Sequence, residues 1–189
     1  MKDSIRNIAE PISKIINCSF QTGIFPDTLK IARVCPIFKA GEKDKISNYR
    51  PISILPSFSK IFEKIAHNRL SSFLATNNIL SDSQYGFRRN NSTFMAVMGM
   101  YEKLSSAIDR NEYAVGIFID LSKAFDTLNH EILCRKLEYY GIRGITLKWF
   151  KNYLENRMQF VYLNDYNISS GLKNVSCGVP QGSIICNIY

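Results

Sequence analysis

Five stretches of the chain repeat apolar residues every three or four positions, which is the spacing of one face of an α-helix. They predict helices over residues 4–17, 57–77, 94–109, 129–140 and 146–157. Pro11 would kink or break the first helix, and Ser92 or Thr93 would cap the third. We expect the apolar faces of the second and third helices in the core: Phe58, Ile61, Phe62, Ile65, Leu70, Phe73 and Leu74 of the second, and Phe94, Val97, Met98, Tyr101, Leu104 and Ile108 of the third.

Shorter runs rich in β-branched and aromatic residues predict strands. Residues 31–38 form one such run, and Pro36 places it near a sheet edge or a bulge. Residues 158–163 alternate and are followed by a turn, so 168–177 is expected to return as their partner. The run from Tyr113 to Ile119 is almost entirely apolar or aromatic, which predicts a largely buried strand.

Composition favours a globular domain with an anionic partner. The chain has 189 residues, of which 46% are hydrophobic, enough to bury a substantial core. Lys and Arg outnumber Asp and Glu 24 to 16, which gives a formal charge of +8. This balance suits a polyanion such as nucleic acid, although many basic proteins bind none.

The cysteines and the N-terminus favour an intracellular protein. The five cysteines include no Cys-x-x-Cys pair, so neither a disulfide partner nor a zinc ribbon is indicated. His130 and Cys134 could form half a zinc site, but nothing near them in sequence supplies the other ligands, so a structural role is preferred. No long apolar run predicts a signal peptide or a membrane contact. We therefore expect a nuclear or cytoplasmic protein that is not secreted.

Asp120 is the first candidate for chemistry, because it directly follows the apolar run. A carboxylate at the end of a buried strand is held at the rim of a sheet, where a metal ion or a phosphate can reach it. Asp is also a favoured N-cap, so Asp120 could equally cap a following helix. Asp126 is interpreted as a structural charge or a charge at a helix N-terminus. The residues alone leave both interpretations of Asp120 open.

Three polar segments offer further candidates. Lys39 and Arg50 stand at the two ends of one turn and could clamp an anion, or could belong to a solvated turn. Residues 80–93 are polar, basic and aromatic together, as in a nucleic-acid contact or in a charged loop before a helix. Residues 178–183 place two glycines around Pro-Gln, which allows close backbone approach to a ligand but also suits any tight turn.

Five segments, in the same order along the chain, resemble the motifs of reverse transcriptases in the form typical of non-LTR retrotransposons of the LINE and jockey type. The resemblance covers nearly the whole chain and favours the functional interpretation of each segment. The segments are PIFKAG (36–41), NYRPIS (48–53), QYGFRRNNST (84–93), FIDLSKAFDTLNH (118–130) and GVPQGS (178–183).

The resemblance implies an α+β chain with the right-hand polymerase fold, truncated to the fingers and part of the palm. Residues 1–112 would be the fingers region, with the N-terminal helix, the triphosphate-binding hairpin and the QxGFR segment. Residues 113–189 would be the partial palm, with the first carboxylate motif and GVPQGS. The implied partners are an RNA template, a DNA primer and a deoxynucleoside triphosphate.

The resemblance also implies a role for each matching residue. Asp120 would be the catalytic carboxylate and, with the backbone carbonyl of Leu121, a ligand of Mg²⁺, of which the intact family enzyme holds two ions. Phe125 would stack under the sugar and select deoxynucleotides. The other nucleotide-binding residues would be Lys39, Arg50, Gln181 and Gly182, and the nucleic-acid-binding residues would be Gln84, Gly86, Phe87, Arg88 and Arg89.

The second catalytic motif of the family, an aromatic-Ala-Asp-Asp hairpin, does not occur in these 189 residues. After GVPQGS the non-LTR pattern continues as Leu-Gly-Pro-Leu, whereas this chain has residues 185–188 as Ile-Cys-Asn-Ile. A two-ion site needs carboxylates from more than one strand. We therefore expect an RNA-directed DNA polymerase by family that is inactive as this polypeptide alone.

Two other interpretations remain open. The chain could be a non-catalytic basic remnant that binds RNA or primer–template through Arg50, Arg88 and Arg89. It could also be a group II intron maturase, which shares the fold and the Arg-Pro-Ile and Pro-Gln-Gly patterns. The spellings FIDLSKAFDTLNH and QYGFRRNNST favour the retrotransposon.

Overall fold

The structure is a computed structural model that describes residues 2–88, 90–121, 123–163 and 166–185. The chain forms two compact units. The first comprises residues 1–68 and 123–187, and the second comprises residues 69–122. These boundaries differ from the predicted division at residue 112. Compactness does not test which residues act as fingers and which as palm, so that functional division stays a prediction.

All five predicted helices are confirmed. They are α1 (Lys2–Thr22), α2 (Ser57–Thr76), α3 (Thr93–Asp109), α4 (His130–Tyr139) and α5 (Gly144–Leu154), with short 3₁₀ turns at Asp27–Leu29 and Ile46–Asn48. Pro11 lies inside α1 without ending it. Ser92 caps α3, because its hydroxyl accepts a hydrogen bond from the Met95 N–H at 3.3 Å. Asn129 caps α4 in the same way through the N–H groups of Glu131 and Ile132.

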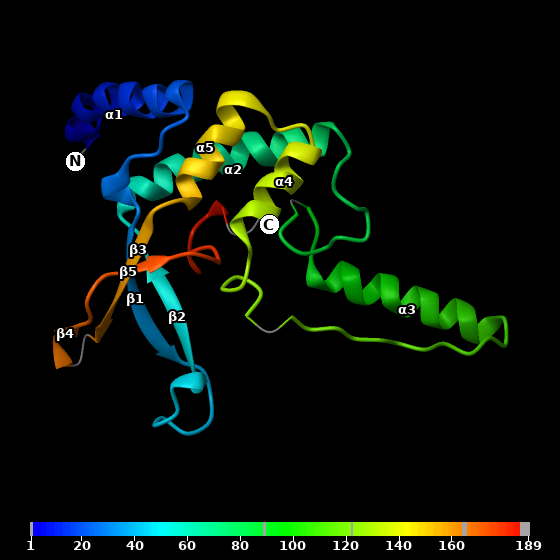
Figure 1. Cartoon of the computed structure of the whole chain (residues 1–189). Helices are drawn as coiled ribbons and strands as arrows, with labels where there is room; N and C mark the ends of the chain where they lie inside the picture. The colour runs from blue at the N-terminus through cyan, green and yellow to red at the C-terminus, as the bar shows by residue number, and fades with distance from the viewer. Residues whose placement is uncertain (1, 89, 122, 164–165, 186–189) are drawn as a thin grey trace. The chain divides into compact units, whose positions relative to one another are not determined.

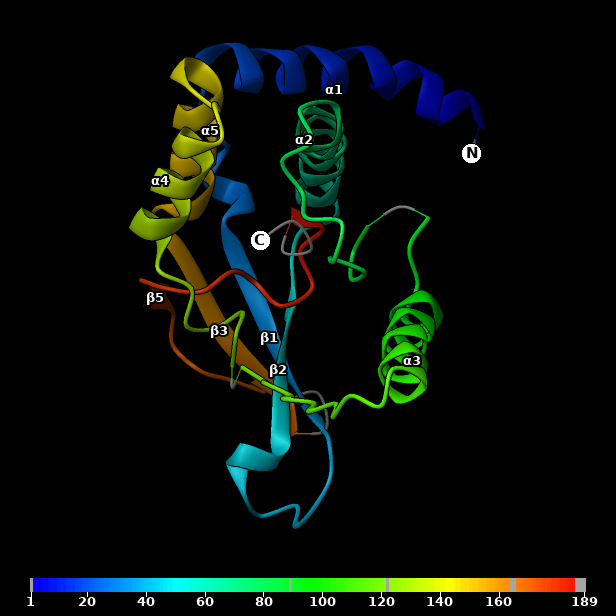
Figure 2. The same ribbon diagram turned by 90° about the vertical axis from the view of Figure 1, so that its right-hand side faces the viewer.

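A small mixed sheet forms the other layer of the first unit. Its strands are β1 (Ile31–Phe38), β2 (Tyr49–Ile54), β3 (Arg157–Leu163), β4 (Ile168–Ser169) and β5 (Lys173–Val175). β1 pairs with β2 as an antiparallel hairpin and with β3 in parallel, and Figures 1 and 2 show these three strands side by side. On its other edge β3 pairs with β4 and β5. The predicted return of the chain after 158–163 is therefore confirmed, although it is split into two short strands.

The core of the first unit is an aromatic cluster centred on Trp149 of α5. The Trp149 side chain is 1% exposed and stacks on the rings of Phe20 and Tyr153, at centroid distances of 4.9 and 5.6 Å. Phe25 is fully buried and meets Trp149 edge-on at 5.6 Å. The indole N–H donates to the Ser19 hydroxyl at 3.0 Å. Trp149 therefore joins α5 to α1 and to the chain that follows it.

Tyr153, in the same cluster, predicts how stability responds to alkaline pH. Burial raises the pKa of its hydroxyl far above the ordinary value of 10.0, and the Glu63 carboxylate raises it further. Above pH 10 the unfolded chain would ionise this group while the folded chain would not. We expect its contribution to stability to be constant below pH 10 and to fall by at most about 1.4 kcal/mol per pH unit above it. Urea unfolding between pH 8 and 11 measures this, and the loss should be smaller for Tyr153→Phe.

Two predictions about the second unit are wrong in this structure. Residues 113–121 have no regular secondary structure, and the side chains of Tyr113, Phe118 and Ile119 are 102, 81 and 84% exposed. Most of the expected core face of α3 is also exposed: Phe94 and Tyr101 are 70 and 64% exposed, and Leu104 is half-buried. Among the described residues of this helix, Ala107 is the one that is buried. An apolar run buries itself only against a partner. No described strand pairs with 113–121, so its composition alone does not make it a strand.

No described helix is both long and apolar enough to cross a membrane.

Candidate nucleotide-binding site

The β1–β2 hairpin carries the two cations that sequence analysis selected. Arg50 is paired with Ile37, and the ladder continues past β1 through a hydrogen bond from the Lys39 N–H to the Asn48 carbonyl at 2.8 Å. Residues two apart along an extended strand point to the same face. Lys39 therefore lies on the face of Arg50 as its diagonal neighbour, a relation that places Cα atoms about 7–8 Å apart.

The turn between these cations is ordered by its own polar groups. The Asn48 amide donates to the Glu42 carbonyl and the Tyr49 hydroxyl to the Lys43 carbonyl, both at 2.8 Å. Lys45 forms an ion pair with Glu42 at 2.7 Å. Lys39 and Arg50 are exposed, and neither is paired with a carboxylate of the described residues. The hairpin thus presents two neighbouring charges that remain available to an anion.

The GVPQGS turn is the second part of the site, and Gly178 fixes it to the second half of the first carboxylate motif, residues 125–128. The Gly178 N–H donates to the Leu128 carbonyl at 2.7 Å, and the Val179 N–H donates to the Phe125 carbonyl at 2.8 Å. Gly178 has a φ of +80°, and a Cβ there would lie 2.7 Å from the Asp126 carbonyl oxygen. Only glycine allows this contact between the two backbones.

Gly182 fixes the same turn to β2. The Ser53 N–H donates to the Gln181 carbonyl at 2.8 Å. Gly182 has a φ of +119°, and a Cβ there would lie 2.8 Å from the Ser53 carbonyl oxygen. Sequence analysis left open whether the two glycines serve close approach of a ligand or a tight turn, and the close approaches in the structure are to protein backbone. The assignment of Gln181 and Gly182 to a nucleotide stays a prediction.

Two side chains that sequence analysis did not assign to the site also hold this turn. A ring nitrogen of His130 lies 2.6 Å from the Gly178 carbonyl oxygen. The Glu63 carboxylate, which is fully buried on α2, accepts from the Ile184 N–H at 2.9 Å. One sequence feature could have indicated Glu63: it is a charged residue beside the apolar face of a predicted helix. Cys134 is buried, and burial raises the pKa of its thiol. The structural role preferred for His130 and Cys134 over half a zinc site stays a prediction.

Phe125 lies beside the turn and contacts it through its backbone carbonyl. Its carbonyl accepts the Val179 N–H, and its side chain is half-buried. Asp126 is exposed, and its carbonyl lies 3.5 Å from the Cys177 sulfur. The sugar-stacking role assigned to Phe125 therefore stays a prediction, supported by its position next to Gly178 and Val179.

In the second unit, the side chains of Gln84 and Arg88 in the QYGFRR segment form hydrogen bonds within their own loop. The Arg88 guanidinium donates to the Ser81 carbonyl at 2.7 Å and lies 3.9 Å from the Asp82 carboxylate. The Asn91 amide donates to the Gln84 carbonyl at 2.9 Å, and the Gln84 amide donates to the Gly86 carbonyl at 3.4 Å.

Phe87 has a φ of +57° and is 69% exposed, so its ring is accessible. Arg89 lies outside the described residues. The nucleic-acid contacts assigned to the segment stay predictions.

Asp120 and Leu121 also belong to the second unit, and both are exposed. No three His, Cys, Asp or Glu side chains gather into a potential metal site in the part of the chain that the structure describes. Mg²⁺ prefers oxygen ligands, which Asp120 and the Leu121 carbonyl could supply. These two ligands do not complete a two-ion site, so the described residues alone do not fit the full metal centre of the family.

The sequence itself has relatives that decide the family. A sequence profile described as "Reverse transcriptase (RNA-dependent DNA polymerase)" matches residues 39–188. The chain belongs to the reverse transcriptase family. The matched region of this reverse transcriptase chain starts at Lys39, directly after β1, and includes β2 with Arg50, the QYGFRR segment, Asp120 and the GVPQGS turn. The resemblance identified from the motifs is therefore confirmed.

Curated relatives place this reverse transcriptase among those of mobile elements. It is 35% identical over 182 residues to "Probable RNA-directed DNA polymerase from transposon BS" and 33% identical over 175 residues to "RNA-directed DNA polymerase from mobile element jockey", both of Drosophila melanogaster. In each case 92% of the chain is covered.

A more distant relative, 26% identical over 179 residues, is "Putative COX1/OXI3 intron 2 protein" of Saccharomyces cerevisiae. The higher identities to the mobile elements favour the retrotransposon over the intron maturase. The chain spans about a fifth of the length of the relatives it matches, at 19% of each of these three.

Proposed function

We propose that this chain is the nucleotide-binding part of an RNA-directed DNA polymerase of a non-LTR retroelement. The observation that carries the proposal is the β1–β2 hairpin, on which Lys39 and Arg50 are diagonal neighbours on one face. Two adjacent cations that form no ion pair with any described residue suit the triphosphate of an incoming deoxynucleotide. A guanidinium can hold phosphate oxygens through its planar fork, and an ammonium adds a point charge.

Template and metal binding belong to the same proposal. The family implies a nucleic-acid template and nucleotide substrates, and its enzymes generally depend on a metal ion. We assign Asp120 and Leu121 to Mg²⁺, and Phe125, Gln181 and Gly182 to the nucleotide. The alternative of a purely basic RNA-binding remnant gains no support from Arg88, whose guanidinium braces its own loop.

Binding of a triphosphate to the purified chain tests the proposal. Arg50→Ala should weaken binding of dTTP about 10- to 100-fold, because a hydrogen bond to a charged group contributes about 1.5–3 kcal/mol. Arg50→Lys should recover only part of the loss, since it keeps the charge but not the fork. Isothermal titration calorimetry measures each affinity.

The matched control is Lys45→Ala in the same turn. Lys45 already pairs with Glu42, so removing it changes the net charge without removing a proposed contact. An equal loss of dTTP affinity in Lys45→Ala and Arg50→Ala would mean general charge attraction and would contradict a triphosphate clamp. Circular dichroism of each variant confirms that the fold is intact.

A further inference from the structure

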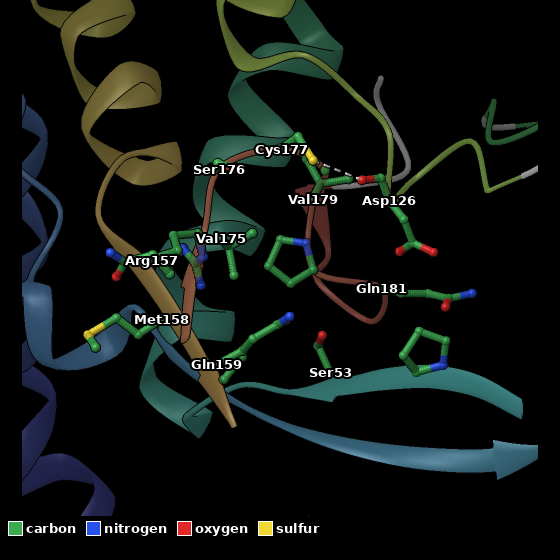
Figure 3. Close-up of a pocket in the computed structure, with 15 residues that line it drawn as sticks. Ser53, Asp126, Arg157, Met158, Gln159, Val175, Ser176, Cys177, Val179 and Gln181 are labelled. Carbon is green, nitrogen blue, oxygen red and sulfur yellow. Dashed lines mark hydrogen bonds between the residues drawn. The ribbon is translucent and has the colours of Figure 1, made fainter. Parts of the chain in front are cut away.

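The sheet formed by β1, β2 and β3 has one face that the GVPQGS turn covers. Ala32, Val34 and Ser53 lie on this covered face and are 3, 5 and 9% exposed. Ala32, Ser53 and Gln159 line a cavity beneath the turn, and Figure 3 shows the side chains of Ser53 and Gln159 pointing into it. Side chains alternate between the two faces of a strand, so the residues between these ones lie on the opposite face, called here the open face.

The open face brings apolar side chains to the surface. Ile31 and Ile37 of β1 are 38 and 53% exposed, and Ile54, which pairs with Arg33, is 41% exposed. Arg33 and Cys35 lie between the two isoleucines of β1 and are half-buried. The alternation along β1 therefore separates a covered face from a face that is accessible along its length.

An arginine and two aromatic rings lie side by side on the open face. The register pairs Arg33 of β1 with Phe160 of β3, and Tyr162 follows two residues further along β3. The Arg33 guanidinium carbon lies 5.4 Å from the centre of the Tyr162 ring. The Tyr162 hydroxyl donates to the Asn167 side chain at 2.6 Å, which fixes the ring that holds Arg33. The face thus presents a positioned guanidinium next to the half-buried Phe160 ring.

The charges on this sheet are all positive. The five strands of the described sheet contain four Arg or Lys residues and no Asp or Glu. Arg33 forms no ion pair with a carboxylate of the residues that the structure describes. Arg50 is paired with Ile37 and so lies on the open face too, with Lys39 as its neighbour. Cations and aromatic rings without a carboxylate suit a polyanion whose bases can stack, which describes single-stranded nucleic acid.

We propose that the open face binds single-stranded RNA, with a base stacking on the Phe160 ring and a phosphate accepting hydrogen bonds from Arg33, which Tyr162 holds in position. None of these three residues lies in the five segments that resemble the family motifs. The choice of RNA rests on the proposed function, in which RNA is the template. An RNA strand on this face leads towards Lys39 and Arg50, to which the incoming nucleotide is assigned.

Cys35 reports on the open face of the unmodified protein. It is a free thiol, and Cys177, which lines the cavity on the covered face, is another. The full 189-residue chain is treated with iodoacetamide with and without an unpaired RNA of about 12 nucleotides. Peptide mass spectrometry gives the alkylation rate of each cysteine. We expect saturating RNA to slow alkylation of Cys35 about threefold or more and to leave the rate at Cys177 unchanged.

The affinity for the same RNA, measured by fluorescence anisotropy over a range of sodium chloride concentrations, separates the two contacts. Arg33→Gln should weaken binding about threefold to tenfold and lower the slope of log affinity against log salt by about 0.7, the value for one lost phosphate contact on a single strand. Phe160→Leu should weaken binding about fivefold or more with the slope unchanged, because it removes a stacking ring and no charge.

The matched control is Lys173→Gln, which removes one positive charge from the same sheet. Lys173 is exposed on β5 and pairs with Gln159, so it belongs to the covered face. Its replacement should change the affinity for RNA less than about twofold. Binding of dTTP, which is assigned to Lys39 and Arg50, should be unchanged in Arg33→Gln, so failure of this proposal is distinguishable from failure of the triphosphate clamp.

Two results would overturn the proposal. One is a loss of RNA affinity in Arg33→Gln no greater than in Lys173→Gln, which would mean general attraction to a basic chain. The other is RNA that leaves the alkylation of Cys35 unchanged, which would place any bound strand elsewhere. If Phe160→Leu does not fold by circular dichroism, the results for Arg33→Gln and Cys35 make the decision.

Discussion

Replacing Trp149 with alanine should lower the free energy of unfolding by about 3–5 kcal/mol, the usual cost of removing a large buried aromatic side chain. The indole is 1% exposed and is enclosed by aromatic rings from α1, α5 and residue 25. Its removal takes away this contact area and also leaves the Ser19 hydroxyl without the indole N–H. Small domains are stable by about 5–15 kcal/mol, so this one change could unfold a large fraction of the chain.

Urea unfolding followed by far-ultraviolet circular dichroism measures the effect. Trp149 is the single tryptophan of the chain, so its fluorescence cannot be compared between the two proteins. The matched control is Ile145→Ala on the same helix, where the side chain is 54% exposed and the expected loss is below about 1 kcal/mol. A loss for Trp149→Ala as small as that of the control would show that α5 is not anchored by this cluster.

Local sequence patterns predicted most of the secondary structure of this chain. The helices, the β1 strand and the return after β3 follow from periodicity and from residues such as Ser92 that begin a helix. The parallel pairing of β1 with β3 did not follow, because it joins Ile31 to Met158 across most of the sequence. The pattern of residues along one strand does not show which distant strand will pair with it.

The face of α2 shows why the position of the core was harder to predict. Apolar periodicity correctly selected Phe62, Leu70 and Leu74, which are 3–4% exposed. It also selected Phe58 and Ile61, which are 51 and 40% exposed, whereas Ser59 and Glu63 are fully buried. The buried face is rotated towards the polar pair because Glu63 meets partners that are remote in sequence. A hydrophobicity scale predicts that a glutamate lies on the protein surface. Glu63 can be buried because its hydrogen bonds in the folded chain offset the cost of removing the carboxylate from water.

The run before Asp120 shows the opposite failure. Its apolar residues predict a buried strand, yet Ile117 and Ile119 are 82 and 84% exposed. β-propensity describes how a side chain packs on a pleated surface, so it has no effect until another strand supplies that surface. The motif match identified Asp120, Lys39 and Gln181 as candidates. It did not predict how Gly178 and Gly182 hold the turn, because that depends on contacts with segments remote in sequence.

The second large effect is expected at Glu63, which connects α2, α5 and the GVPQGS turn. One carboxylate oxygen accepts from the hydroxyls of Ser59 and Tyr153, at 2.8 and 3.0 Å, and the other accepts from the Ile184 N–H at 2.9 Å. Glu63→Ala would leave all three donors without this acceptor in a buried place. We expect a loss of about 3–5 kcal/mol in the free energy of unfolding, because each buried donor left without an acceptor costs about 1–3 kcal/mol.

Glu63→Gln separates a general loss of stability from a specific loss of the turn. Its amide oxygen can still accept from Ser59 and Tyr153, but its NH₂ group would face the Ile184 N–H, donor against donor. We therefore expect a smaller loss of about 1–3 kcal/mol together with faster hydrogen exchange at Ile184, while the amides of β3 exchange as before. Glu138→Gln, at an exposed position of α4, should change neither quantity. Unchanged exchange at Ile184 in Glu63→Gln would mean that His130, Ser53 and the two glycines hold the turn without the carboxylate.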